Sequence, residues 1–352
     1  LGFSRLLSLL RSEGKIASRL HTNDCQFFIA TTHTDSMKDF AKRAVGFVAL
    51  AMILYAGYRF AAHNQWIIVT HGERVVETGE SPQVIDPESE FSLLVIGDTG
   101  YDSNQRTEVV AAMRRHSQGA APDAVVLLGD NFYEHGVDSV DDPRFQTDFE
   151  NLFDEPSFPF PFYVCLGNHD YGGDINAQVR YTEKSDRWTM PANHYSVRHL
   201  IGDVAIDLFV IDTYLIANPD RRGKDELAWL DQQLTQSDAT FKIVIGHHPA
   251  ISGGRHGAYP AITETVPELL REHAVDLYLS GHDHDLQLND SGHGWLQVVS
   301  GSGSKLRSTT WTDQTIFAKA APGFCWILIR GDQLWVTFYS TESRLFTSHV
   351  GN

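Results

Sequence analysis

Residues 124–133 read AVVLLGDNFY, an apolar run that stops at a glycine and passes at once into a carboxylate and a phenol. Four other segments repeat this arrangement of an apolar run followed by side chains that bind metals. They are DTG at 98–100, GNHD at 167–170, VIGH at 244–247 and GHDH at 281–284. Short β-branched runs of this kind predict buried strands, so each polar side chain stands where a strand ends and a loop begins. In α/β proteins that edge is where active sites are built.

The side chains at these five strand ends are of the types that bind two hard or borderline cations side by side. Asp98 and Asp130 supply hard oxygens, and one of them must bridge if two metals are to lie about 3.5–4 Å apart. The phenol of Tyr133 suits ferric iron, whose charge keeps the phenol deprotonated near neutral pH. His282 and His284 are two residues apart, so an extended backbone directs both imidazoles to the same side.

In spelling and order the five segments resemble the DxG, GDxxY, GNH(D/E), VxxH and GHxH motifs of the calcineurin-like metallophosphoesterases. Within that superfamily they resemble the purple acid phosphatases, and most of all tartrate-resistant acid phosphatase. The likeness runs from about Phe91 to the C-terminus and includes GDNFYEHGV at 129–137 and GHDHDLQ at 281–287. It implies an α/β fold, a four-layer α/β/β/α sandwich in which two mixed β-sheets pack face to face.

The resemblance also implies which residue holds which metal. Asp130 is expected to bridge the two ions. The other expected ligands are Asp98, Tyr133 and His284 at a first site and Asn168, His247 and His282 at a second. The first site would hold Fe(III) and the second Fe(II), Zn(II) or Mn(II). Charge transfer from the tyrosinate to iron would colour the protein purple.

The implied activity is that of an acid phosphatase, in which a metal-bound hydroxide attacks the phosphorus of a phosphate monoester. The substrate would be a small phosphomonoester or a phosphoprotein. With 28 Lys and Arg against 45 Asp and Glu, the chain has a net charge of −17. This charge argues against a nucleic-acid binder that relies on a basic surface. We expect a monomer that binds no nucleic acid.

Two histidines outside the ligand set are candidates for protonating the leaving group. His169 adjoins Asn168, and His256 lies nine residues after His247, as the matching histidine does in tartrate-resistant acid phosphatase. An imidazolium at either place could protonate the leaving oxygen or bind phosphate, and the sequence does not divide these roles. Asp170 is expected to be a carboxylate that orients a histidine.

Two other classes of function stay open. A phosphodiesterase or nucleotide hydrolase on the same scaffold would typically carry DxH in the first motif, where this chain has Gly100, and would lack Tyr133. A non-catalytic binding protein would be expected to have lost metal ligands, and all seven are present. Lys305, after the strand run that ends at 299–301, is either a substrate contact or a solvated loop lysine.

Strand and helix signals alternate in the first half of the domain, and strands dominate after His282. The predicted helices are 104–118, 224–236, 262–272 and 142–153. The predicted later strands are 294–299, 324–329 and 334–340. We expect one catalytic domain over residues 87–352, in which Cys165 and Cys325 are buried free thiols.

The segment before this domain has a different character. Residues 37–43 (MKDFAKR) are a basic region, and the uncharged apolar run 44–58 follows them. Together they indicate a signal peptide or an N-terminal membrane anchor over 37–62. Residues 1–36 are either upstream sequence or a presequence, and 63–86 is expected to be a linker. The protein is therefore expected to be secreted, periplasmic or anchored to a membrane outside the cytoplasm.

Overall fold

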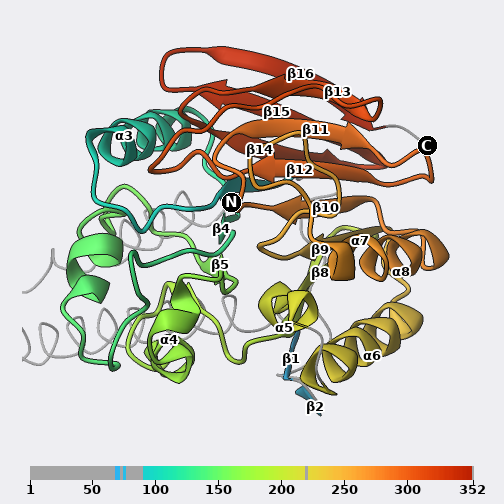
Figure 1. Ribbon diagram of the computed structural model, residues 1–352, viewed down its shortest axis with the longest axis horizontal. Helices are drawn as coiled ribbons and strands as arrows, with labels where there is room; N and C mark the ends of the chain where they lie inside the picture. Colours follow the sequence, from blue (N-terminus) through green and yellow to red (C-terminus); the bar gives the residue numbers. More distant parts are fainter. Residues whose placement is uncertain (1–67, 72–73, 77–89, 219–220, 351–352) are drawn as a thin grey trace, which may run out of the picture. The chain divides into compact units, whose positions relative to one another are not determined.

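The computed structural model describes residues 68–71, 74–76, 90–218 and 221–350. The chain divides into two compact units, Leu1–Ala62 and His63–Asn352, and every described residue belongs to the second. Two mixed β-sheets and the helices that cover them make up this second unit (Figure 1).

One sheet has seven strands. They are β3 (Glu90–Ile96), β4 (Ala124–Leu127), β5 (Phe162–Val164), β6 (Trp188–Thr189), β14 (Gly323–Arg330), β15 (Gln333–Ser340) and β16 (Arg344–Val350). Their order is β16-β15-β14-β3-β4-β5-β6. Strands β3 to β6 are parallel, and β14, β15 and β16 are antiparallel to their neighbours. The carboxyl ends of the four parallel strands therefore lie along one edge of the sheet.

The other sheet has nine strands. They are β1 (Ile68–His71), β2 (Arg74–Val76), β7 (Tyr195–Ile201), β8 (Val204–Val210), β9 (Phe241–Ile245), β10 (Leu277–Ser280), β11 (Leu286–Asp290), β12 (Leu296–Ser300) and β13 (Thr315–Lys319). Their order is β13-β11-β12-β10-β9-β8-β7-β1-β2. Strands β8, β9, β10 and β12 are parallel, and the remaining pairs are antiparallel.

Strands β1 and β2 correct the predicted domain boundary. Residues 63–86 were expected to be a linker before a domain that begins at Pro87. Instead β1 pairs with β7 and β2 pairs with β1, so both strands belong to the nine-stranded sheet. Ile68, Val69 and Thr70 are β-branched and suit a strand. A sheet edge with unpaired backbone groups recruits such a segment, and only the tertiary structure shows that edge.

Side chains alternate between the two faces of the nine-stranded sheet. Ile243 and Ile245 of β9 lie in the core shared with the seven-stranded sheet, whereas Val244 lies in a second core. In β10, Leu279 and Tyr278 divide between the two cores in the same way. This period of two shows that one face packs on the other sheet and the opposite face packs on helices.

Helices complete the two outer layers. Helix α3 (Asn104–Gly119) contributes Met113 to the core of the seven-stranded sheet. Leu230, Ile262 and Leu270 lie in the second core and belong to α6 (Arg221–Gln236), α7 (Pro260–Thr263) and α8 (Val266–Glu272). Figure 1 shows α6, α7 and α8 grouped beside β8, β9 and β10, away from α3 and α4 (Ile175–Tyr181). The predicted four-layer sandwich is confirmed.

The helix predictions differ from the structure in two places. The predicted helix 262–272 is two helices, α7 and α8, with Thr265 between them. Pro267 explains the break, because proline has no N–H to continue the hydrogen bonds of a preceding helix and fits only in the first turn of a new one. The region 142–153 holds one turn of π-helix over Phe145–Glu150. A short helix that was not predicted, α5, spans Thr213–Ala217.

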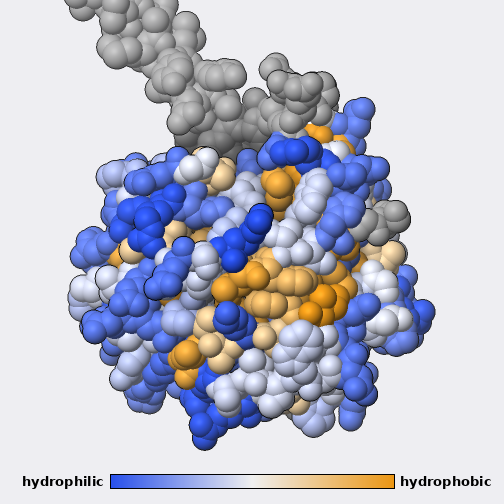
Figure 2. Space-filling view, turned by 90° about the horizontal axis from the view of Figure 1, so that it is seen from above, coloured by the Kyte–Doolittle hydropathy of each residue, from blue (hydrophilic) through white to orange (hydrophobic). Residues whose placement is uncertain are grey.

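One side of the surface combines hydrophilic and apolar areas. Figure 2 looks onto the side of the molecule on which β13 and β16 lie in Figure 1, and it shows a mainly hydrophilic face crossed by an apolar band. On these two edge strands Phe317 and Phe346 are half-buried, and their stacked rings lie 4.9 Å apart between centroids. The two sheets thus come together at this end through aromatic packing.

Three further sequence predictions concern single segments. Cys165 and Cys325 are buried free thiols, as predicted. The predictions for 1–36 and for the apolar segment in 37–62 fall outside the described residues. Within the described ranges, no helix is both long enough and apolar enough to cross a membrane.

Candidate dinuclear metal centre

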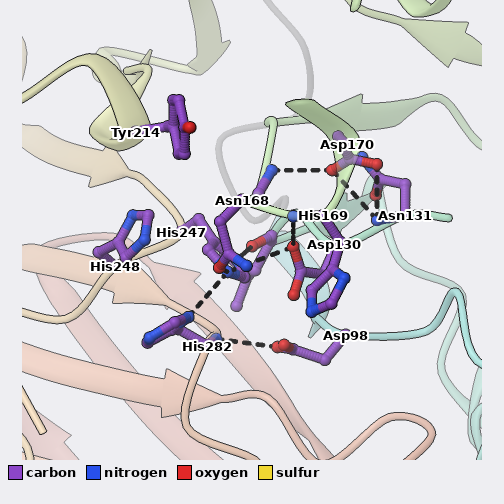
Figure 3. A network of polar contacts seen from close by, with 12 residues as sticks. Asp98, Asp130, Asn131, Asn168, His169, Asp170, Tyr214, His247, His248 and His282 are labelled. Atoms are coloured by element: carbon purple, nitrogen blue, oxygen red, sulfur yellow. Dashed lines mark hydrogen bonds and ion pairs between the residues drawn. The ribbon is translucent and has the colours of Figure 1, made fainter. Parts of the chain in front are cut away.

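The seven predicted ligands come from both sheets and meet where the strands end. The seven-stranded sheet carries the oxygen donors, which follow β3, β4 and β5: Asp98, Asp130, Tyr133 and Asn168. The nine-stranded sheet carries the nitrogen donors, which follow β9 and β10: His247, His282 and His284. Figure 3 shows most of these side chains pointing toward one another. The candidate site therefore lies on the boundary between the two sheets.

The backbone turns sharply at three of these residues. Asp98, Asp130 and His282 have φ angles of 57°, 52° and 66°, in the left-handed region that non-glycine residues seldom occupy. Each such residue costs about 1–3 kcal/mol and persists where the surrounding structure holds it in place. At Gly129, with φ +86°, a Cβ would lie 2.7 Å from the backbone nitrogen of Gly167, so a side chain would separate the two loops. These turns direct the three ligand side chains toward the boundary between the two sheets, where the candidate site lies.

Four donor groups form a first cluster. The Tyr133 hydroxyl lies 3.2 Å from Asp98 Oδ1 and 3.4 Å from His284 Nε2. His284 Nε2 lies 3.3 Å from the same Asp98 oxygen. The Tyr133 hydroxyl also donates a hydrogen bond to Asp130 Oδ2 at 2.7 Å. Two carboxylates, a phenol and an imidazole therefore converge on one small volume.

A second cluster gathers around His247. Its Nε2 lies 3.2 Å from Asn168 Oδ1, 3.2 Å from His282 Nδ1 and 3.5 Å from Asp130 Oδ1. Asp130 therefore places Oδ2 in the first cluster and Oδ1 in the second. This is the position that a bridging carboxylate needs.

The electrostatics of the clusters favour a cation. Burial raises the pKa of the Asp98 carboxyl well above its usual range. Burial, and then the Asp98 and Asp130 carboxylates, raise the pKa of the Tyr133 phenol well above its usual range. Burial lowers the pKa of His284 to about 4 and that of His282 below its usual range, so both imidazoles are neutral near pH 7. A bound cation would offset the burial and mutual repulsion that raise the pKa of these acidic groups, and neutral imidazole is the form in which histidine binds metals.

A backbone carbonyl fixes the orientation of His247. The Nδ1 of His247 lies 2.8 Å from the carbonyl oxygen of Leu128, which can only accept, so Nδ1 carries the proton. The lone pair on Nε2 then faces the second cluster. Ligand atoms of Asp98, Asp130 and His247 lie within 4.8 Å of one another, and so do those of His247, His248 and His282. With three imidazoles, a phenol, an amide and two carboxylates, the predicted donor set fits a pair of metal ions.

The two predicted catalytic histidines flank the clusters. The His169 ring lies 4.2 Å from the Tyr133 ring, and its Nδ1 lies 2.8 Å from the carbonyl oxygen of Glu134, which leaves Nε2 free of that contact. The His256 ring lies 4.7 Å from the His282 ring. His169 follows a strand of the seven-stranded sheet, and His256 belongs to the loop after β9 of the other sheet. The two imidazoles thus reach the site from opposite sheets.

Asp170 has a different role from the expected one. Its carboxylate accepts hydrogen bonds from the backbone N–H of Asn131 at 3.1 Å and of Gly167 at 2.8 Å, and from the Gln178 side chain at 2.9 Å. Burial and the nearby Asp130 carboxylate raise its pKa to about 7. All the hydrogen bonds that Asp170 makes to described residues go to backbone and amide groups, so it does not orient an imidazole. It holds the loop after β4 against the loop after β5.

The structure shows the contacts of two further residues at the site, of which sequence reasoning missed Asp283. Asp283, between two ligands, accepts a hydrogen bond from the backbone N–H of His256 at 2.8 Å and another from the Ser252 hydroxyl. His248 is buried beside the second cluster, with its Nδ1 2.9 Å from the Thr213 hydroxyl. A carboxylate inside GHDH and a second histidine after VIGH were visible in the sequence, but nothing there showed their direction.

The fold and the site define a class of protein, the calcineurin-like phosphoesterases. The chain belongs to this family, whose model matches residues 91–286. Purple acid phosphatase 4 of Arabidopsis thaliana is 34% identical over 283 residues, which cover 73% of this chain and 82% of that protein. Tartrate-resistant acid phosphatase type 5 of Oryctolagus cuniculus is 31% identical over 247 residues, 62% of this chain and 76% of that protein. Within its class, the chain belongs to the purple acid phosphatases and is a binuclear-metal phosphoesterase.

Solved structures agree with the fold. GAP50, the anchor in the inner membrane complex of Plasmodium, superposes with a TM-score of 0.68 at 24% identity, over 74% of this chain and 89% of that one. The purple acid phosphatase PPD1 from yellow lupin seeds superposes with a TM-score of 0.57 at 15% identity, over 75% of this chain and 54% of that one. At these identities the likeness concerns architecture, and function depends on the site residues.

Proposed function

We propose that the protein is an acid phosphatase that hydrolyses phosphate monoesters at the dinuclear centre. The observation that carries this proposal is the packing of Gly100, in the first motif. A Cβ on Gly100 would lie 2.6 Å from the backbone of Asn131 and Phe132. No side chain fits there unless the loop that carries Asp130 moves. The DxH histidine expected of a phosphodiesterase therefore has no room, while the Tyr133 phenol occupies the first cluster.

The proposed metals are Fe(III) in the first cluster and Fe(II), Zn(II) or Mn(II) in the second. Asp98, Tyr133 and His284 would hold the first ion, Asn168, His247 and His282 the second, and Asp130 both. The phenol beside two carboxylates supports the ferric assignment, because a hard trivalent ion is the partner that a phenolate prefers. When bound, the pair would supply a hydroxide nucleophile at mildly acidic pH and a strong positive field around the phosphate oxygens.

His169 and His256 would complete the reaction. As the bond from phosphorus to the ester oxygen breaks, its electron pair stays on the leaving oxygen, which then needs a proton. In the imidazolium form His169 can give this proton from Nε2, while Nδ1–H keeps its hydrogen bond to the Glu134 carbonyl. His256 has its backbone fixed by Asp283 and is exposed toward solvent, so it can exchange protons or contact the phosphate.

A direct experiment combines metal analysis with two substrates. Iron and the divalent metals would be measured in the purified protein together with the visible spectrum. Hydrolysis of p-nitrophenyl phosphate would be compared with that of bis(p-nitrophenyl) phosphate. We expect two metals per chain, a visible absorption band and a strong preference for the monoester. A preference for the diester would contradict the proposal.

Substrate and location are also proposals. The substrate is a small phosphomonoester or a phosphoprotein, and the protein acts as a monomer that binds no nucleic acid. The basic and apolar segments of 37–62 favour an extracytoplasmic enzyme, either released or anchored. Fractionation of cells that express the full chain, with protease protection, would test this placement.

A further inference from the structure

The loop after β12 carries Arg307 to the edge of the first cluster. The backbone N–H of Arg307 donates a hydrogen bond to the carbonyl oxygen of His284 at 2.9 Å, so Arg307 is fixed to a residue of the first cluster. The same loop is fixed to the loop that carries His256. The N–H of Thr310 donates to the carbonyl oxygen of Gly253 at 2.8 Å, and Gly254 forms a β-bridge with Thr309.

These two loops have little freedom to separate. A Cβ on Gly253 would lie 2.0 Å from the Thr310 carbonyl oxygen, so the backbones touch. His256 is fixed in turn by its hydrogen bond to Asp283. Arg307 and His256 therefore stand at fixed places on neighbouring loops, beside His284 of the first cluster.

The Arg307 guanidinium lacks an acidic partner. Its Nε is buried without a hydrogen-bond partner among the described residues, although Arg307 as a whole is half-buried. No described carboxylate forms an ion pair with it. Its charge still reaches the site. After burial, the Arg307 guanidinium is the largest cause that lowers the pKa of both His256 and His284.

Lys305, two residues earlier, provides the contrast. Its Nζ lies 3.3 Å from Glu134 Oε1 and 3.8 Å from the centroid of the Tyr101 ring. Lys305 is thus already satisfied by a carboxylate and an aromatic face. The chain has a net charge of −17, so carboxylates are abundant, yet none pairs with this guanidinium among the described residues. Partial burial of a guanidinium without an acidic partner costs free energy, and an anion bound from solution would offset that cost.

We infer that Arg307 forms an anion subsite beside the dinuclear centre, which binds a second negative group on the leaving alcohol of the substrate. This inference rests on the proposed phosphomonoesterase function and narrows its substrate class. Favoured substrates are small phosphomonoesters whose alcohol carries a carboxylate or a further phosphate. Arg255, exposed beside His256, adds positive charge on the same side. The planar guanidinium suits two-point binding of such a group.

The test uses two substrates with the same three-carbon skeleton. Glycerol 3-phosphate has a neutral leaving alcohol, and 3-phosphoglycerate has one that carries a carboxylate. For Arg307→Gln we expect kcat/KM on 3-phosphoglycerate to fall about 10- to 100-fold, and on glycerol 3-phosphate by less than about 3-fold. Arg307→Lys keeps the charge and should recover part of the loss. Arg330→Gln removes an equal charge from an exposed ion pair with Glu90 and should change neither value.

The alternatives give different results. Equal losses on both substrates would place Arg307 on the scissile phosphate and overturn the subsite, as would no loss on either. Thermal melting and metal content of each variant would separate these outcomes from misfolding, and Arg307→Lys serves if Arg307→Gln does not fold. A wild-type protein that hydrolyses neither substrate nor p-nitrophenyl phosphate would overturn the proposed function itself, and this inference with it.

Discussion

The two β-sheets carry different halves of the chemistry. The seven-stranded sheet presents oxygen donors, with two carboxylates, a phenol and an amide after β3, β4 and β5. The nine-stranded sheet presents imidazoles after β9 and β10. Each cluster takes donors from both sheets, so neither sheet by itself offers a complete metal site. Metal binding and packing of the sheets should therefore stabilise each other.

Hydrogen bonds between the sheets help to hold the two halves in register. The His282 N–H donates to Asp98 Oδ2 at 2.9 Å, and His247 Nδ1 donates to the Leu128 carbonyl at 2.8 Å. Farther along the boundary the Tyr171 hydroxyl donates to Asp212. The two sheets thus differ in the donor atoms that they offer, and these hydrogen bonds contribute to their relative position. Four substitutions test this description, beginning with the largest expected effect.

Asp130→Asn should have the largest effect, because this carboxylate reaches both clusters. We expect loss of at least one metal per chain and a fall in kcat of about 10³-fold or more. Metal analysis and phosphatase assays would measure both. Asp231→Asn, which removes the same charge from an exposed carboxylate, is the control. Two-metal occupancy with a near wild-type rate would show that the clusters do not share Asp130.

His169→Ala and His256→Ala each remove one imidazole, the first from the side of the seven-stranded sheet and the second from the other. Each should lower kcat on alkyl phosphates about 10²- to 10³-fold. The loss should be smaller on p-nitrophenyl phosphate, whose leaving group departs without a proton. His293→Ala, at an exposed position, should change neither rate. Losses of the same size on both substrates would indicate phosphate binding rather than proton donation.

Tyr133→Phe removes one oxygen donor from the seven-stranded side and should act on the spectrum more than on the fold. We expect the visible absorption of the metal-loaded protein to disappear, with a melting temperature within several degrees of wild type, since one hydroxyl is lost. Tyr101→Phe, whose ring lies 6.4 Å from that of Tyr133, should keep the colour. Unchanged absorption in the Tyr133 variant would rule out tyrosinate as the source of colour.

Asp212→Asn should have the smallest effect, on the pH dependence of stability. Burial, and then the neighbouring Glu226 carboxylate, raise the pKa of Asp212 to about 7. The unfolded chain ionises near pH 4, so the stability that protonated Asp212 contributes is full below about pH 4 and is lost as pH rises to about 7. Melting temperatures of metal-free protein from pH 4 to 8 should fall less steeply in the variant. Parallel curves would contradict the raised pKa.

The site could be predicted from the sequence to the extent that its chemistry is local. Each ligand stands within a few residues of a short apolar run, and five such runs in a known order resemble one family. Asp283 and Arg307 could not be predicted in this way. Their importance comes from neighbours on other loops, His256 for Asp283 and His284 for Arg307, and no local pattern encodes those contacts.

The role of Asp170 shows the same limit. The aspartate after Asn168-His169 was expected to orient a histidine, but its partners include the N–H groups of Asn131 and Gly167, which belong to two different loops. Strands β1 and β2 also depended on tertiary structure, because a short β-branched run becomes a strand only where a sheet edge is open to it.

By itself the sequence determined the strand-to-loop positions of the donors, because the alternation of apolar and polar residues is a local property of the chain. The family and the four-layer architecture followed from the resemblance of its five motifs to a known family. Only the tertiary structure decided that oxygen and nitrogen donors come from opposite sheets and that Arg307 stands unpaired beside His256. Those facts depend on how two sheets pack and how distant loops are held together, and such contacts have no signature in the spacing of residues along one chain.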